Sequence, residues 1–234
     1  MKNNSEPKIF PPVRAAIQAL VKGFCEGGKL NPADGDAFIN LLVTVFSQQD
    51  NFAIKLRAMD LAFDEKKTFE PVREYCFDLL MVNFFAADSK ELDETYLESK
   101  EWMEIEEKTL DRGTEMLNIL LYINECAEAE VEISLSDFLQ EFLLAEDDLY
   151  QDEYPIYEPV LKNQHLADGD IKDIIAASQH IDNPELKDVF VPMLVFFNDA
   201  QSAAEKRGDL QKYSINKAND LAVLMALEEF HKEV

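Results

Sequence analysis

One segment near the N-terminus has the spacing of a nucleotide-binding loop. Residues Gly23 to Lys29 match the first seven positions of the pattern G-x-x-x-x-G-K-[ST], in which backbone N–H groups surround phosphate oxygens and the lysine meets their charge. The eighth position is Leu30, so the hydroxyl group that would hold Mg²⁺ is missing. An apolar stretch with helical spacing precedes the glycines, where the motif requires a strand. The pattern therefore favours a helix that ends at these glycines.

Two other patterns contain potential metal ligands. Glu228 and His231 have the i, i+3 spacing by which helical di-iron proteins direct a carboxylate and an imidazole to one metal, but such a site needs two of these pairs and this chain has one. The triplets Asp34-Gly35-Asp36 and Asp168-Gly169-Asp170 lack the ligand order of a calcium-binding loop. Aspartates in the first turn of a helix interact favourably with its dipole, which accounts for both triplets. We therefore predict no metal site and no cofactor.

The chain contains no recognisable motif of a nucleophilic or dinucleotide-dependent enzyme. No two of its glycines are separated by a single residue, which excludes both the G-x-S-x-G and the G-x-G-x-x-G loops. Cys25, Cys76 and Cys126 lie in apolar helical stretches without a Cys-x-x-Cys pair, a pattern typical of buried thiols in a reducing compartment. The 47 acidic residues leave one enzymatic alternative open, a helical carboxylate-rich metalloprotein or hydrolase.

The acidic residues are unevenly distributed. The chain has 47 Asp and Glu against 22 Lys and Arg, a formal net charge of −25. Residues 113–161, which we call the acidic segment, contain 13 acidic residues and no Lys, Arg or His. Its densest part, residues 146–158, interleaves three tyrosines with six acids. The candidate partner-binding residues in this part are Asp147, Asp148, Tyr150, Asp152, Glu153, Tyr154, Tyr157 and Glu158.

Tyrosine next to carboxylates indicates a protein-binding surface. Tyrosine supplies contact area, while carboxylates steer a basic partner over about a Debye length, roughly 8 Å at physiological salt. The alternative is that the tyrosine rings pack on the core and only the acids face water. A segment without cations does not favour direct binding to nucleic acid or to an anionic membrane. We expect a non-enzymatic adaptor or chaperone-like protein with a basic protein partner, or alternatively an acidic nucleic-acid mimic that inhibits a DNA-binding protein.

The elements that position these residues are predicted to be helices. Leu, Ile, Val and Phe make up 70 of the 234 residues, enough for a sizeable core, whereas runs with strand-like alternation are nearly absent. Cap residues, prolines and glycines separate apolar runs of helical spacing. The expected helices span residues 12–26, 32–49, 51–64, 69–87, 90–126 (with a break near 99 as an alternative), 135–150, 155–163, 169–180, 184–206 and 215–232.

We predict an all-α fold without β-sheet, either an irregular multi-helix bundle or a short array of antiparallel helical hairpins, with about nine or ten helices. A single domain spanning residues 1–234 is expected. Short recurrences suggest two weakly related halves, at residues 10–112 and 135–234. The first twelve residues lack the apolar core of a secretion signal, and no apolar stretch approaches 18 residues, so the expected location is cytoplasmic. The oligomeric state is left open.

Overall fold

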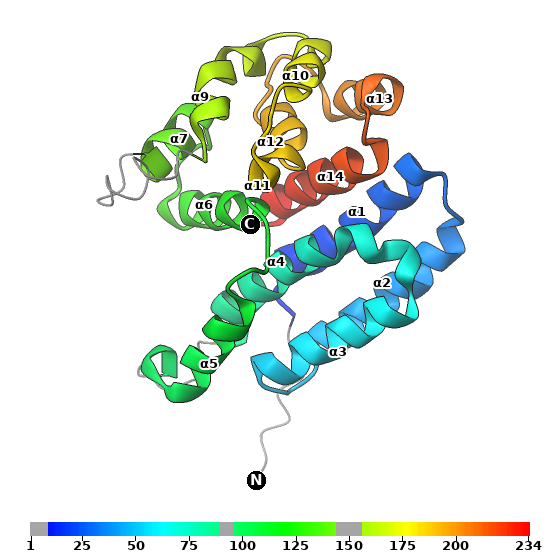
Figure 1. The fold of residues 1–234 in the computed structure, drawn as a ribbon, viewed down its shortest axis with the longest axis vertical. Coiled ribbons are helices and arrows are strands. Elements are labelled where there is room, and N and C mark those ends of the chain that lie inside the picture. The colour runs from blue at the N-terminus through cyan, green and yellow to red at the C-terminus, as the bar shows by residue number, and fades with distance from the viewer. Residues whose placement is uncertain (1–8, 89–95, 144–155) are drawn as a thin grey trace.

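The computed structural model describes residues 9–88, 96–143 and 156–234, and these residues form helices and connecting loops without a strand (Figure 1). The first part contains α1 (Pro11–Gly28), α2 (Pro32–Phe46), α3 (Phe52–Glu65), η1 (Lys67–Val72), α4 (Arg73–Asn83) and the π-helical turn η2 (Phe84–Asp88). The second contains η4 (Tyr96–Glu98), α5 (Lys100–Thr109), α6 (Met116–Ala129) and α7 (Leu135–Leu143). The third contains α9 (Glu158–Asn163), η5 (Gln164–Asp168), α10 (Ile171–Ser178), α11 (Pro184–Lys187), α12 (Phe190–Phe196), α13 (Ala203–Tyr213) and α14 (Lys217–Glu233).

The all-α prediction is confirmed, but the expected number of helices is slightly too low. For the helix expected over 90–126, the alternative of a break near residue 99 is correct, because Ser99 caps a new helix, and residues 90–95 lie outside the described residues. A second break, which was not expected, occurs where Gly113 adopts a left-handed φ of 91°. The helix expected over 184–206 divides into three. Asn198 ends α12 by accepting hydrogen bonds from the backbone of the next turn, and Ser202 starts α13 with a capping box.

Two long helices, α1 and α14, form the centre of the molecule and run antiparallel (Figure 1). The ring of Phe10 at the start of α1 lies 6.3 Å from that of Phe230 near the end of α14. Gly23 and Gly27 let the two backbones approach, because an added Cβ would lie 2.6 Å from the Leu221 carbonyl oxygen at Gly23 and 2.4 Å from the Lys217 carbonyl oxygen at Gly27. Gly23, the first glycine of the nucleotide-loop pattern, and Gly27 therefore serve helix packing.

The buried apolar side chains form one contiguous cluster that extends from Ile9 to Phe230. On one side of the central pair, Phe38 stacks on Phe69 with ring centroids 4.4 Å apart. On the other side, Phe138 stacks on Phe197 at 5.8 Å. Aromatic contacts of this kind add to the hydrophobic stabilisation of a core. None of the described helices is both long and apolar enough to cross a membrane.

Candidate functional site

The described part of the acidic segment comprises α6, α7 and the start of α9, which lie on the same side of the molecule (Figure 1). Of the eight candidate partner-binding residues, only Tyr157 and Glu158 are described. The others lie outside the described residues; they are Asp147, Asp148, Tyr150, Asp152, Glu153 and Tyr154.

Tyr157 is a core residue, so its ring does not form part of the surface. Its exposed fraction is 2%, and its ring lies 5.7 Å from that of Phe138. Its hydroxyl donates to the Glu115 carboxylate and accepts from the Asn118 amide at 3.3 Å. Burial and the nearby Glu115 charge raise the pKa of Tyr157 well above its ordinary value. This tyrosine follows the alternative of core packing that the sequence left open.

Most acids whose side chains are described in this segment face water. Glu158 is exposed and pairs with Lys162, one helical turn later, at 2.5 Å. The side chains of Glu128, Glu130 and Glu132, at the end of α6 and in the following loop, are also exposed. Since surface ion pairs contribute little to stability, these carboxylates chiefly give this side of the molecule a negative potential.

A cavity of about 290 Å³ lies beside these acids, where the start of α7, η5 and the end of α12 meet. We call it the Asp168–Asp199 cavity. Its walls combine apolar side chains with polar groups; the lining residues are Ile133, Ser134, Leu135, Ser136, Gln164, His165, Ala167, Asp168, Phe196, Phe197 and Asp199. Drug-sized ligands usually occupy roughly 300–1,000 Å³. This cavity therefore suits one side chain or a small fragment rather than a dinucleotide.

A buried asparagine joins the two segments that carry the aspartates of this cavity. Asn198 is fully buried, and its amide nitrogen donates to the Gly169 carbonyl at 3.0 Å. This bond joins the loop after α12, which carries Asp199, to the end of η5, which carries Asp168. Both aspartates are exposed, and neither forms a hydrogen bond or ion pair with a described residue. The cavity is therefore lined by two aspartates that have no described hydrogen-bond or ion-pair partner.

The buried cation Lys206 and the two serines that line the cavity have other partners. The ammonium of Lys206, which is 8% exposed, donates to the Phe196 carbonyl at 3.1 Å, and burial lowers its pKa. Ser134 accepts from the Asp137 amide as a helix cap, and Ser136 accepts from Gln140. Among the described residues, no hydrogen bond joins either serine to His165.

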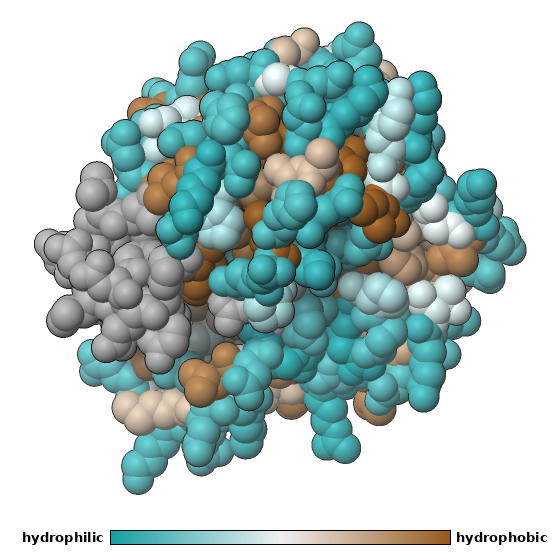
Figure 2. All heavy atoms as spheres, turned by 45° about the horizontal axis from the view of Figure 1, so that its top comes forward, coloured by the Kyte–Doolittle hydropathy of each residue, from teal (hydrophilic) through white to brown (hydrophobic). Residues whose placement is uncertain are grey.

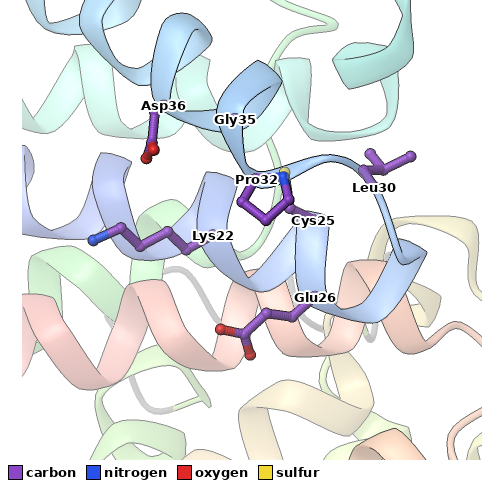
Figure 3. Close-up of a pocket in the computed structure, with 7 residues that line it drawn as sticks. All are labelled: Lys22, Cys25, Glu26, Leu30, Pro32, Gly35 and Asp36. Carbon is purple, nitrogen blue, oxygen red and sulfur yellow. The ribbon is translucent and has the colours of Figure 1, made fainter.

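A second cavity, of about 250 Å³, lies between α1 and α2 and brings two sequence patterns together (Figure 3). It is lined by Lys22, Cys25, Glu26, Leu30, Pro32, Gly35 and Asp36. The segment that resembles a nucleotide loop and the first Asp-Gly-Asp triplet thus share one cavity. Gly35 packs directly over the thiol of Cys25, because an added Cβ would lie 2.8 Å from its sulfur. We call it the Cys25 cavity.

The chemistry of the Cys25 cavity favours neither a phosphate nor a reactive thiol. Burial, followed by the charges of Asp34 and Asp36, raises the pKa of Cys25, which keeps the thiol protonated. The same carboxylates and Glu26 repel an anion. Asp34 lies in the first turn of α2, and Asp170 caps α10 by accepting from the Lys172 amide at 2.9 Å. The interpretation as a helix start holds for Asp34 and Asp170, whereas Asp168 lies at the end of η5.

Glu228 and His231 do not converge on a common point with other ligands. The guanidinium of Arg207 donates two hydrogen bonds to the Glu228 carboxylate, from Nε at 3.0 Å and from Nη2 at 2.6 Å. The ring of His231 lies 6.0 Å from that of Phe196, and burial lowers its pKa. Across residues 9–88, 96–143 and 156–234, no three His, Cys, Asp or Glu side chains are placed to hold a metal ion.

A polar network anchors the chain where the acidic segment begins. Arg112 donates to Glu74 at 2.8 Å and to Asp60 at 3.2 Å, and its guanidinium lies 4.9 Å from the centre of the Phe77 ring. Asp78 is fully buried and accepts from the backbone amide of Thr114 at 2.9 Å and from its hydroxyl at 2.5 Å. Burial raises the pKa of Asp78. The network fixes the start of α6 and with it this side of the molecule.

The residues that define the Asp168–Asp199 cavity were only partly visible in the sequence. Asp168 belongs to a triplet that the sequence singles out, but nothing local connects it to Asp199. Asp199 falls within a helix predicted to be continuous, and its exposure depends on the turn that Asn198 creates.

Comparison with protein-family models, with curated proteins and with solved structures finds no match for this chain.

Proposed function

We propose that this protein is a non-enzymatic binding protein, of the adaptor or chaperone-like kind, that docks a basic segment of another protein. The docking face comprises α6, α7, α9 and η5. The observation that carries this proposal is the Asp168–Asp199 cavity, which places two unpaired carboxylates and apolar walls beside exposed acids of the acidic segment. A basic partner would be steered by the negative potential and then retained by contact with the cavity.

The character of the surface and of the cysteines supports this proposal. Figure 2, in which the top of Figure 1 comes forward, shows mainly hydrophilic side chains interrupted by small apolar patches. Protein interfaces of non-obligate type combine polar and apolar area in this way. The three cysteines are free and buried, which fits a protein that works in a reducing compartment such as the cytoplasm.

The test compares two sets of charge changes on the full chain. One variant removes three carboxylates from the proposed face: Glu128→Gln, Glu130→Gln and Glu132→Gln. The control variant removes three from the region of α2 and α3: Asp36→Asn, Asp50→Asn and Glu65→Gln. All six side chains are exposed, and both variants reduce the net negative charge by three. Any difference between them therefore depends on location and not on total charge.

The probe is a fluorescently labelled peptide in which Arg alternates with Ser and Leu, and binding is measured by anisotropy at low and high salt. We expect the peptide to bind the parent protein, to bind less tightly at high salt, and to lose more affinity in the first variant than in the control. Equal losses in the two variants would show binding to net charge alone and would refute a defined face. No binding at low salt would also contradict the proposal.

A further inference from the structure

The Asp168–Asp199 cavity has the features of a receptor for one long cationic side chain. Its walls include Phe196, Phe197 and Leu135, which suit a hydrocarbon stem, and its two aspartates suit a positive end group. The cavity volume of about 290 Å³ equals that of about ten water molecules, at about 30 Å³ each. This space accommodates a side chain but not a folded element of a partner.

We propose that this cavity binds an arginine side chain of the basic partner, with its guanidinium group between Asp168 and Asp199. This inference rests on the proposed function and names the anchor of the same face. Arginine fits better than lysine because its planar group has five N–H donors in a fixed fork, which can meet two carboxylates on separate loops. A guanidinium also stacks on aromatic rings, and two phenylalanines line the cavity.

The chain itself contains the arrangement that we propose for the partner. Arg112 lies between the carboxylates of Glu74 and Asp60, with its guanidinium over the ring of Phe77. Arg73 repeats the pattern, because it contacts Asp60 and Asp64 and lies 5.4 Å from the centre of a phenylalanine ring. The cavity supplies the same set of groups, two carboxylates and phenylalanine rings, without an arginine from the described residues.

The carboxylates of the cavity are available and held in place. Lys206, the buried cation close to Asp199, donates to the Phe196 carbonyl and forms no ion pair with that aspartate. The bond from Asn198 to Gly169 fixes the two loops relative to each other, so little conformational freedom is lost when a ligand bridges them. His165 at the rim is exposed and hydrogen-bonds to no described residue.

The test uses three variants of the full chain. Asp168→Asn with Asp199→Asn removes the charge of the cavity, and Ser136→Trp fills the cavity without a change of charge. Glu26→Gln with Asp36→Asn, at the Cys25 cavity, is the control with the same loss of two charges. Circular dichroism confirms that each variant is folded. The probes are the Arg, Ser and Leu peptide and a peptide in which every Arg is replaced by Lys.

We expect the parent protein to bind the arginine peptide more tightly than the lysine peptide. The double aspartate variant and Ser136→Trp should each weaken binding of the arginine peptide by roughly tenfold or more, whereas the control should stay within about twofold of the parent. If both cavity variants bind like the parent while the Glu128, Glu130 and Glu132 variant binds weakly, the arginine anchor is refuted and the docking face remains. If no variant lowers the affinity for the arginine peptide, both the arginine anchor and the docking face are refuted.

Discussion

The close approach of α1 and α14 predicts that the same substitution has opposite effects at two glycines. Both Gly23 and Gly208 lie inside helices, α1 and α13, so replacement by alanine changes helix propensity equally. Glycine within a helix is less favourable than alanine by roughly 0.5–1 kcal/mol. At Gly208 no atom lies within 4 Å of an added Cβ. Gly208→Ala should therefore stabilise the protein by about this amount.

At Gly23 the added methyl group has no space. It would lie 2.6 Å from the Leu221 carbonyl oxygen, 2.9 Å from the Leu221 carbonyl carbon and 2.9 Å from the Ala222 Cα. These are backbone atoms of α14, which cannot rotate away as a side chain can, so α1 and α14 must separate. Overpacking of this kind costs about 1–3 kcal/mol. Because three backbone atoms are in the way, the upper part of this range, about 2–3 kcal/mol, applies. After the gain in helix propensity is subtracted, Gly23→Ala should destabilise the protein by about 1–2.5 kcal/mol.

Urea unfolding, followed by circular dichroism at the helix band, measures both effects. The midpoint should rise for Gly208→Ala and fall for Gly23→Ala, while the dependence of the unfolding free energy on urea stays constant. A rise of equal size in both variants would show that the two helices are not packed backbone to backbone. It would also remove the explanation given for the glycines of the nucleotide-loop pattern.

Three further predictions concern buried polar groups. Burial raises the pKa of Asp220 to about 7, against roughly 3.9 in an unfolded chain, so the folded state holds a proton that the unfolded state releases. The free energy of unfolding should therefore fall as pH rises from about 4 to 7, by on the order of 4 kcal/mol for this group, and Asp220→Asn should flatten the pH dependence measured by urea unfolding. Tyr157→Phe removes the donor to the Glu115 carboxylate and should cost about 1.5–3 kcal/mol in the same assay; a cost below about 0.5 kcal/mol would contradict the buried hydrogen bond. Cys25, Cys76 and Cys126 are all buried, so a thiol reagent should label the native protein far more slowly than the urea-unfolded chain, and fast native labelling would contradict their burial.

Local signals in the sequence were sufficient for several helix boundaries. The expected start of α2 at residue 32 is correct, because Pro32 occupies the first turn and Asn31 accepts a hydrogen bond from the Ala33 amide. The start of α3 is likewise capped by Asn51, whose side chain accepts from the Ile54 amide. These interactions join residues two or three positions apart, so residue types at that spacing are enough to predict them.

Two of the missed boundaries involve contacts between distant residues, whereas the capping box of Ser202 and Glu205 is a local signal that the prediction missed. Gly113 ends its turn where the loop meets Glu74 and Asp78, more than 30 residues earlier in the chain. Asn198 interrupts the predicted helix over 184–206, and its amide reaches Gly169, which is 29 residues away. The burial of Tyr157 could not be predicted for the same reason, since it depends on Glu115, which precedes α6, and on Phe138 in α7.

Composition and contacts between near neighbours were enough to predict the helical class, several helix caps and the concentration of acidic residues in one segment. The folded chain was needed to show that Gly23 and Gly27 allow two helices to pack, that Tyr157 enters the core, and that Asp168 and Asp199 line one cavity. The physical reason is that burial and pairing of a side chain are set by segments far away in the chain. The sequence does not distinguish an acidic residue in water from one in the core, yet water stabilises the ionised carboxylate and burial disfavours it.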